Sequence, residues 1–504
     1  MNPLYPTPTD DPMDPLNWSA WRKNICIATV MFSYFLFTYV GILSYSFARL
    51  NCQAEEKLRE LNMVTYTQVN WTLAIPSLGL AVGPLFWSSF ADIYGRRIIM
   101  ITGTCIAIIA TGCSSLHNIS LGGYMATRFF QGFGASPAAT VGLSIINDLS
   151  FEHQRGFRVG LWVLAIDMGT YTGVLIGGFL ALVDQYWVQY HVIILFAVLL
   201  VLEVVFLPET LYPRSYVLAH AHDESTAVSA AQTSGDGEKA GNMIGIGLNV
   251  KRTRQLGYLY VGKIPAVNHP NVWETLIHFG YMWRYPTVVL PVLMYVFFQY
   301  WWCSSILTML PAAYEDYKVD IQGLFVIGLM LGTVIAEVAF SGRLSDWLVA
   351  RLAAKNGGTR VPEMRLWLAY PGAVFSAVGL LVWGLSIARS WHWITGQVAS
   401  FIFAAGLQMG NTVISSYIVD NYPDYAIDII TFYSVILNLS AFAEPWFINY
   451  WVEASGYTWA FAAQTMITAF GIIIGIGLVQ LYGGRIRAWS GAPSWTTASS
   501  RTEL

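Results

Sequence analysis

Four acidic side chains lie inside long apolar segments of the chain, at Asp167, Glu203, Glu337 and Glu444. An ionised group in the middle of a lipid bilayer costs about 2.5–3.5 kcal/mol on insertion scales, so such a residue is expected to face a cavity or a partner. A carboxylate held there can bind a proton or the positive charge of an organic cation. These four positions are therefore the first candidates for chemistry in this sequence.

Arg128 lies inside another apolar segment, and its depth can be compared with that of Asp167. At the rise of a helix, Asp167 lies about 13 Å from the start of its segment, and Arg128 lies about 10 Å from the far end of its own. The two then differ in depth by about 6 Å, which a long arginine can bridge. We hypothesise that they interact and that Asp167 binds a proton or a cation. The alternative for Arg128 is a structural ion pair.

The other acidic residues divide into two kinds by their surroundings. Glu444 precedes Pro445, which frees a backbone carbonyl and can kink a helix. A cavity-facing glutamate beside a kink suits a cationic solute or a proton, so we favour a functional role for Glu444. Glu203 and Glu337 lie nearer the ends of their segments, where snorkelling or pairing at a helix end explains them. We therefore interpret those two as structural.

Aromatic side chains crowd two of the apolar segments, residues 24–47 and 287–311. Aromatic faces bind apolar or cationic organic molecules through burial and cation–π contact. Most of these side chains we interpret as lipid-facing packing or an interfacial belt. The candidates that we single out for binding, in these segments and in residues 430–452, are Tyr34, Tyr39, Gln299, Trp302 and Asn438.

The elements that would position these residues follow from composition and hydropathy. The 504 residues are 55% apolar and only 11% charged, with a mean hydropathy of +0.50, whereas soluble proteins carry about 25% charged residues. This composition excludes a disordered chain, a disulfide-rich mini-domain and an ordinary soluble enzyme. A spanning helix needs about 20 mostly apolar residues. The sequence predicts twelve, at residues 24–47, 67–89, 98–116, 121–146, 158–182, 188–208, 287–311, 322–344, 366–388, 393–418, 430–452 and 457–482.

The predicted spans divide the chain into two sets of six. We place an N-terminal segment at 1–23, six spans in 24–208, a central segment at 209–286, six spans in 287–483 and a tail at 484–504. Most of the 27 Lys and Arg residues then fall on the side of the N-terminus, which predicts that both termini are cytoplasmic. The middle of the central segment is a polar linker, and residues 271–286 fit either an interfacial helix or an ordered loop.

A short signature follows the second span of each half. Residues 88–97 read SSFADIYGRR and residues 342–351 read GRLSDWLVAR. The first resembles the signature G-x-x-x-D-x-x-G-R-R of the major facilitator superfamily, with Ser88 in the place of the first glycine. The resemblance implies an all-α membrane protein whose twelve transmembrane helices form two six-helix bundles related by a pseudo-two-fold axis. It implies a structural or gating role for Asp92, Gly95, Arg96, Arg97, Gly342 and Asp346.

Two further segments resemble motifs of the same family. Residues 128–136 read RFFQGFGAS and are similar to R-x-x-Q-G-x-G-A, whose arginine, here Arg128, the family links to proton coupling. Residues 169–178 read GTYTGVLIGG and are similar to the antiporter motif G-x-x-x-G-P-x-x-G-G, except that Val174 replaces the proline. Glycines spaced in this way allow close helix packing. The structural positions in the two motifs are Gln131, Gly132, Gly173, Gly177 and Gly178.

Residues 14–23, 208–214 and 417–423 narrow the resemblance to the fungal twelve-span drug:proton antiporter branch, which includes polyamine and organic cation transporters. The resemblance implies a proton-coupled secondary active transporter of the plasma membrane. We expect it to export a small drug-like or metabolite-like amphiphile by alternating access. The alternatives are a proton- or potential-driven importer of polyamines or organic cations, and a transporter-like nutrient receptor. We expect a monomer in the lipid bilayer, with no enzymatic activity, cofactor, metal or nucleic-acid partner.

Overall fold

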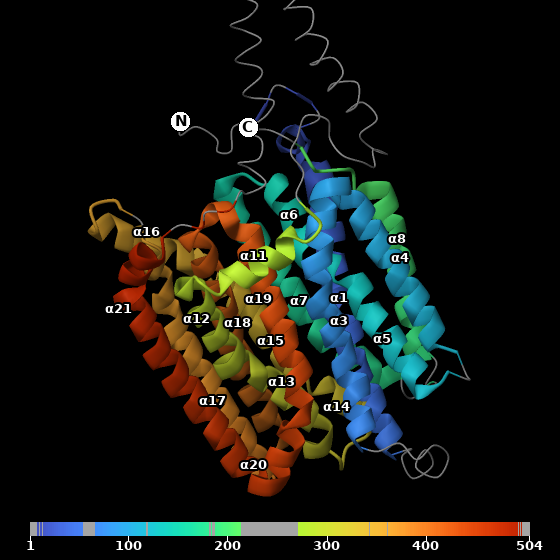
Figure 1. Ribbon diagram of the computed structural model, residues 1–504. Helices are drawn as coiled ribbons and strands as arrows, with labels where there is room; N and C mark the ends of the chain where they lie inside the picture. Colours follow the sequence, from blue (N-terminus) through green and yellow to red (C-terminus); the bar gives the residue numbers. More distant parts are fainter. Residues whose placement is uncertain are drawn as a thin grey trace, which may run out of the picture.

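The structure of the chain is a computed structural model. It describes residues 8–9, 11–12, 14–53, 66–116, 119–180, 183, 187–212, 271–341, 343–359, 361–491, 493 and 495. Within these residues all regular secondary structure is helical. Twelve helical segments are long and apolar enough to cross a membrane, and they run side by side (Figure 1). The expected all-α membrane fold with two six-helix bundles is therefore confirmed.

The first six spans form the N-bundle, in which each span is a nearly continuous helix. The fourth span is divided where Ser136 meets Pro137, because proline has no backbone N–H to donate. The helices are α1 (Ala20–Gln53), α3 (Tyr66–Tyr94), α4 (Arg96–Ser114), α5 (Leu121–Ala135) with α6 (Pro137–Asp148), α7 (Glu152–Leu180) and α8 (Trp187–Phe206).

The last six spans form the C-bundle, and most of them contain an irregular turn. The seventh span is α12 (Pro286–Tyr295), η2 (Val296–Tyr300) and α13 (Trp301–Ala313), and the eighth is α14 (Val319–Leu324), α15 (Ile327–Ala336) and η3 (Glu337–Ser341), which leads into α16 (Arg343–Lys355). The others are η4 (Pro362–Leu368) with α17 (Ala369–Ala388), α18 (Trp393–Asn421), α19 (Ala426–Ala443) with η6 (Glu444–Trp446), and α20 (Ile448–Met466), η7 (Ile467–Ile472) and α21 (Ile473–Ser490).

Two of the irregular turns begin at acidic residues that the sequence singled out. Glu337 is the first residue of η3, a π-helical turn. Glu444 is the first residue of η6, because Pro445 cannot donate to the preceding turn and α19 ends at Ala443. A wide or tight turn inside a helix re-aims the side chains at and beyond it. The direction of these two side chains therefore could not follow from straight-helix geometry.

The helices have two ends that differ in what covers them. We call the end where α1 begins and α21 finishes the terminal end, which is uppermost in Figure 1, and the opposite one the distal end. A further helix, α11 (Glu274–Met282), crosses the terminal end and packs on both α3 and α19 (Figure 1). The hydroxyl groups of Ser89 in α3 and Thr275 in α11 are 2.6 Å apart. Residues 271–286 thus contain a helix that bridges the bundles.

Glycines let the helices of the N-bundle approach closely. A side chain at Gly132 of α5 would collide with the carbonyl oxygen of Pro76 in α3, and one at Gly134 would collide with the backbone of α4. A side chain at Gly169 of α7 would likewise collide with the carbonyl oxygen of Phe35 in α1. Small residues at such contacts allow tight packing without a hydrophobic driving force.

The two bundles meet along two sets of helices. α3 packs on α19, and α7 packs on α14 and α15. Near the distal end, the ring of Trp71 in α3 lies 5.9 Å from that of Phe442 and 4.8 Å from that of Trp446, between centroids. Aromatic pairs at these distances attract one another beyond their burial. These rings join the two bundles near the distal end.

The last described residues of the chain are fastened to the terminal end of the C-bundle. The indole Nε1 of Trp495 donates a hydrogen bond to Asp428 Oδ2, at 3.0 Å. Its ring stacks on His278 of α11, with centroids 5.1 Å apart. The Tyr425 hydroxyl donates to the carbonyl oxygens of Pro493 and Trp495, at 2.7 and 3.1 Å. Trp495 therefore holds α11 against the start of α19.

Candidate functional site

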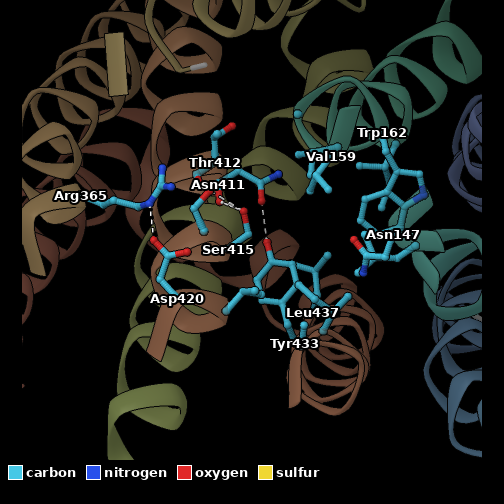
Figure 2. A pocket seen from close by; sticks show the side chains of 18 of the residues that line it. Asn147, Val159, Trp162, Arg365, Asn411, Thr412, Ser415, Asp420, Tyr433 and Leu437 are labelled. Atoms are coloured by element: carbon cyan, nitrogen blue, oxygen red, sulfur yellow. Dashed lines mark hydrogen bonds and ion pairs between the residues drawn. The ribbon is translucent and has the colours of Figure 1, made fainter. Parts of the chain in front are cut away.

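A cavity of about 530 Å³ lies between the two bundles. Its walls come from α1, α6 and α7 of the N-bundle and from η2, η4, α16, α18 and α19 of the C-bundle. Figure 2 shows Trp162 and Asn147 across the pocket from Arg365 and Asp420. The lining stretch of α18, residues 411–420, is its half nearer the terminal end. The cavity therefore reaches toward the terminal end, where its lining residue Asp420 is exposed, and the described rings of Trp71, Phe442 and Trp446 join the bundles on its distal side.

Asp167 is the acidic residue in the deep part of this cavity. It lies on α7 and is buried, with an exposed fraction of 8%. It interacts with the side-chain amide of Asn411 and, electrostatically, with the carboxylate of Glu337. The Tyr433 hydroxyl donates to Asn411 Oδ1 at 2.8 Å (Figure 2), which leaves the amide N–H₂ of Asn411 to face Asp167. The structure thus orients a donor toward this carboxylate.

Glu337 is not itself a lining residue, but it lies directly behind the lining residues Gly160 and Thr412, where the C-bundle touches α7. Its Oε2 accepts hydrogen bonds from Gln408 Nε2 and Thr412 Oγ1, at 2.7 and 2.8 Å. Its Oε1 lies so close to Gly160 that a side chain at that position would collide with it. The wide turn of η3 aims Glu337 across the bundle interface.

Aromatic rings line the cavity next to Asp167. Tyr34 of α1 and Trp162 of α7 stack with centroids 4.0 Å apart and planes within 3° of parallel. Tyr300 and Tyr433 line the opposite wall. An organic cation with an apolar body gains from such faces through burial and cation–π attraction. The site therefore combines an acidic group with aromatic walls.

The mouth of the cavity is electrically balanced. Arg365 of η4 pairs with Asp420 of α18, with Nε and Oδ2 2.5 Å apart (Figure 2), and both residues line the cavity. A cation that enters from the terminal end meets this neutral pair first and the carboxylate of Asp167 deeper. Within the described residues, no group of three or more His, Cys, Asp or Glu side chains is placed to hold a metal ion.

Arg128 is buried inside the N-bundle and does not line the cavity. Its Nη1 donates to Gln131 Oε1, and its Nη2 donates to the carbonyl oxygen of Val40 at 3.2 Å. Gln131 in turn donates to Thr111 of α4, at 2.7 Å. The hypothesised pair with Asp167 does not form in this structure, because Arg128 bonds to α1 and to Gln131 of its own helix while Asp167 lines the cavity.

Two further candidates bond inside the C-bundle. Glu444 is fully buried, and its Oε2 accepts a hydrogen bond from Thr308 Oγ1 at 3.3 Å. Gln299 lies in η2 and donates from Nε2 to Ser376 Oγ and to the carbonyl oxygen of Gly406, at 2.8 and 3.0 Å. Neither residue lines the cavity, so the prediction that they contact the solute directly is not supported by their positions.

Three further binding candidates also form hydrogen bonds within their own bundle. Tyr39 bonds with His191 Nε2 at 2.8 Å, within the N-bundle. Trp302 and Asn438 each donate to a carbonyl oxygen one turn earlier in their own segment, at 2.9 and 2.8 Å. Of the eight predicted binding residues, the cavity lining includes Asp167 and Tyr34.

A sequence profile described as Major Facilitator Superfamily matches residues 25–445. The chain belongs to the major facilitator superfamily. A solved superfamily structure, the proton:xylose symporter XylE of E. coli, aligns with a TM-score of 0.61 and 14% identity over 96% of this chain and 99% of that one. A partially occluded inward-open form of XylE aligns with a TM-score of 0.59 and 15% identity, over 92% and 98% of the two chains. This likeness concerns the fold alone.

Fungal relatives within the superfamily match from about four fifths to nearly all of the chain at low identity. Protein HOL1 of Saccharomyces cerevisiae is 24% identical, over 97% of this chain and 90% of its own length. The probable efflux pump mfs2 of Aspergillus flavus is 28% identical, over 78% and 87%. The efflux pump vrtL of Penicillium aethiopicum is 26% identical, over 95% and 90%. The chain therefore has the family and fold of membrane transporters.

The superfamily signature at residues 88–97 fastens the start of α4. Gly95 has a φ of 107°, and a side chain there would collide with the carboxylate of Glu209. That carboxylate accepts from the backbone N–H groups of Arg96 and Arg97, at 3.0 and 3.1 Å. The Arg96 side chain pairs with Asp148 of α6. The glycine is needed here both for its backbone angle and for the close approach of Glu209.

The structure describes some of the other superfamily motif positions and not others. Asp92 is half-buried near the terminal end of α3. Gly342 and the side chain of Asp346 lie outside the described residues, so their gating role stays a prediction. Gly323 of α14 packs on α7 next to Gly178, in the motif whose glycines are Gly173, Gly177 and Gly178.

The sequence also held a signal for site residues that were not singled out. Gln408, Asn411, Thr412 and Ser415 are polar residues in an apolar span, spaced by three and four positions. This spacing puts them on one face of a helix, and in the structure that face of α18 binds Glu337 and approaches Asp167. A polar stripe on a membrane helix indicates a cavity or a partner.

Proposed function

We propose that this protein is a proton-coupled secondary active transporter of a small organic cation that carries an apolar body. The observation that supports this most directly is the cavity between the bundles, where the buried carboxylate of Asp167 lies beside the stacked rings of Tyr34 and Trp162. A buried carboxylate without a cation or a proton is unfavourable in a low-dielectric site. A cationic solute and a proton therefore compete for the same position.

Transport would proceed by alternating access of this site to the two sides of the plasma membrane. The terminal end is the cytoplasmic one in this proposal, because most Lys and Arg residues lie on that side. The structure is then an inward-facing state, with the distal end closed by Trp71, Phe442 and Trp446. An inward-facing cavity loads solute from the cytoplasm when the protein exports it.

Export is the direction that we propose first, and it is supported by the likeness to fungal efflux pumps such as mfs2 and vrtL. Import of polyamines or other organic cations is the second candidate. It is favoured by a specific observation: Glu337 lies against Gly160 of α7, the helix that carries Asp167, and acts on Asp167 electrostatically, so two buried carboxylates contribute to one site. A negative cytoplasm would draw a cation to such a site from the outside.

The test is transport into proteoliposomes that contain the purified protein, Asp167→Asn, or the control Asp316→Asn, whose aspartate is exposed. We expect wild type and the control to accumulate labelled tetraphenylphosphonium or spermidine, and Asp167→Asn to lose most of this activity. An Asp167→Asn variant as active as wild type would contradict the proposal, as would wild-type vesicles that move neither probe.

The imposed gradients separate the two directions. Accumulation that requires an acidic vesicle lumen indicates exchange of the cation for protons, which is export in the cell. Accumulation of spermidine driven by a lumen-negative potential alone, above the level in protein-free vesicles, indicates import; spermidine is the probe for this step because tetraphenylphosphonium crosses a bilayer unaided. The two gradients are applied to the same vesicles, so the comparison does not depend on how much protein is inserted.

A further inference from the structure

Glu337 occupies the point where the C-bundle meets α7. Its carboxylate is held from one side by Gln408 and Thr412 of α18 and lies against Gly160 of α7 on the other. It is buried, with an exposed fraction of 7%. Because η3 packs on α7 as well as on α18, any rocking of one bundle against the other moves this carboxylate relative to the N-bundle.

Asp167 is the acidic group that interacts with Glu337 from the N-bundle. The amide of Asn411 also interacts with it. In the described part of the chain, no lysine or arginine is among the side chains that interact with Asp167. The other titratable groups that interact with it electrostatically are hydroxyls of tyrosines and one thiol, those of Tyr34, Tyr171, Tyr295, Tyr433 and Cys303.

We infer that Asp167 and Glu337 form an acid pair, one carboxylate from each bundle, that takes up one positive charge at a time, either a proton or the cationic group of the solute. The inference rests on the proposed function and names the second carboxylate of that site. Two negative charges repel each other strongly away from bulk water. Such a pair titrates as a unit and favours one bound positive charge.

The exchange at this pair balances in charge. When the cation enters, the O–H bond of the protonated carboxyl breaks, the proton leaves to water in the cavity, and the solute's positive charge takes its place. When the cation leaves, a proton from water returns to one carboxylate. The two carboxylates belong to different bundles, so rocking changes the distance between them. The repulsion between their charges changes with it, and so does the affinity of the pair for a positive charge. This links the exchange to the change of access.

The test measures charge selectivity and proton release with the purified full chain. Binding of tetraphenylphosphonium and of neutral triphenylphosphine oxide is measured by calorimetry at fixed pH, and a pH-indicator dye reports protons released on cation binding. The variants are Glu337→Gln, Glu337→Asp and Gly160→Ala. The matched control is Glu203→Gln, which changes a buried glutamate on α8 that lies against α4, outside the cavity.

We expect Glu337→Gln to weaken tetraphenylphosphonium binding about tenfold, because one attracting charge is lost. Binding of the neutral probe should stay unchanged, and fewer protons should be released. Glu337→Asp keeps the charge and should restore much of the selectivity. Gly160→Ala displaces the carboxylate and should act in the same direction as Glu337→Gln. Glu203→Gln should match wild type in both readouts.

A failure of the acid pair can be distinguished from a failure of the proposed function. If Glu337→Gln binds the cation and releases protons as wild type does, the acid pair is wrong while the proposed function stands. If Glu337→Gln weakens cationic and neutral probes equally, Glu337 is structural and the pair is again wrong. If wild type binds tetraphenylphosphonium no better than Asp167→Asn does, the proposed function fails and the pair fails with it.

Discussion

The stacked rings of Tyr34 and Trp162 give the cavity an aromatic face before any solute arrives. Cation–π attraction is worth about 0.5–2 kcal/mol, so replacing Tyr34 by leucine should weaken binding of tetraphenylphosphonium about two- to thirtyfold. Tyr34→Phe keeps the ring and should bind nearly as wild type does. Equilibrium dialysis with the labelled cation measures both affinities. An equal loss in the two variants would assign the effect to the hydroxyl group instead of the ring.

Asp167 was predictable because an acidic residue at mid-depth of an apolar segment is costly unless it faces a cavity or a partner. The direction of the Glu337 side chain was not predictable. The wide turn of η3 re-aims it, and the depth of a residue along a straight helix does not give its direction. Arg128, Gln299 and Glu444 lie inside spanning helices as predicted, but their side chains bond within the bundles. Which face of a helix meets the cavity depends on packing between bundles, which the sequence does not give.

At the scale of elements, α4 begins with a capping arrangement that its own sequence does not supply. The first backbone N–H groups of a helix lack partners within it, and here Glu209 accepts those of Arg96 and Arg97. We expect Glu209→Ala to lower the free energy of unfolding by about 1–2 kcal/mol, since it removes a charged cap at a helix N-terminus. Thermal unfolding of the purified protein, followed by tryptophan fluorescence, measures the loss.

The matched substitution for this test is Glu453→Ala, because Glu453 is exposed on α20. It should leave the midpoint of unfolding where wild type has it. A Glu209→Ala protein that unfolds at the wild-type temperature would show that water caps α4 as well as the carboxylate does.

The elements themselves were largely readable from the sequence. The hydropathy pattern predicts twelve spans, and each has a helical counterpart, because every backbone polar group in a bilayer must be bonded within the chain. For residues 271–286 the sequence left two possibilities, and packing against α3 and α19 accounts for the helix α11. The π-helical turns of η2 and η3 carry no comparable signal, since they depend on contacts between spans.

At the scale of the whole molecule, the two ends of the bundle interface differ. The rings of Trp71, Phe442 and Trp446 join the bundles near the distal end, while the cavity reaches toward the terminal end. Each aromatic pair contributes about 0.5–1.5 kcal/mol, and Trp71 makes two of them, so Trp71→Ala should shift the population toward a distal-open state about five- to 150-fold. A cysteine at Ser415, inside the cavity, should then react more slowly with a membrane-impermeant thiol reagent applied from the terminal side.

The labelling is done in a Cys113→Ser background, because Cys113 is an exposed native thiol. Trp459→Ala is the control, since Trp459 is 74% exposed and is not one of the rings that close the distal end. If Trp71→Ala leaves the labelling rate of the cavity cysteine unchanged, the tryptophan does not hold the distal end closed.

Trp495 has a practical consequence for attaching reporters to this protein. Its ring covers His278 of α11, and α11 is joined to α3 through Thr275 and Ser89. A fluorescent protein or affinity tag fused after residue 490 deletes Trp495 and loosens the helix that bridges the bundles. The same tag fused after residue 504 keeps it. Cell-surface counts and transport rates obtained with the shorter fusion would therefore describe a protein that has lost the contacts of Trp495 with His278 and Asp428.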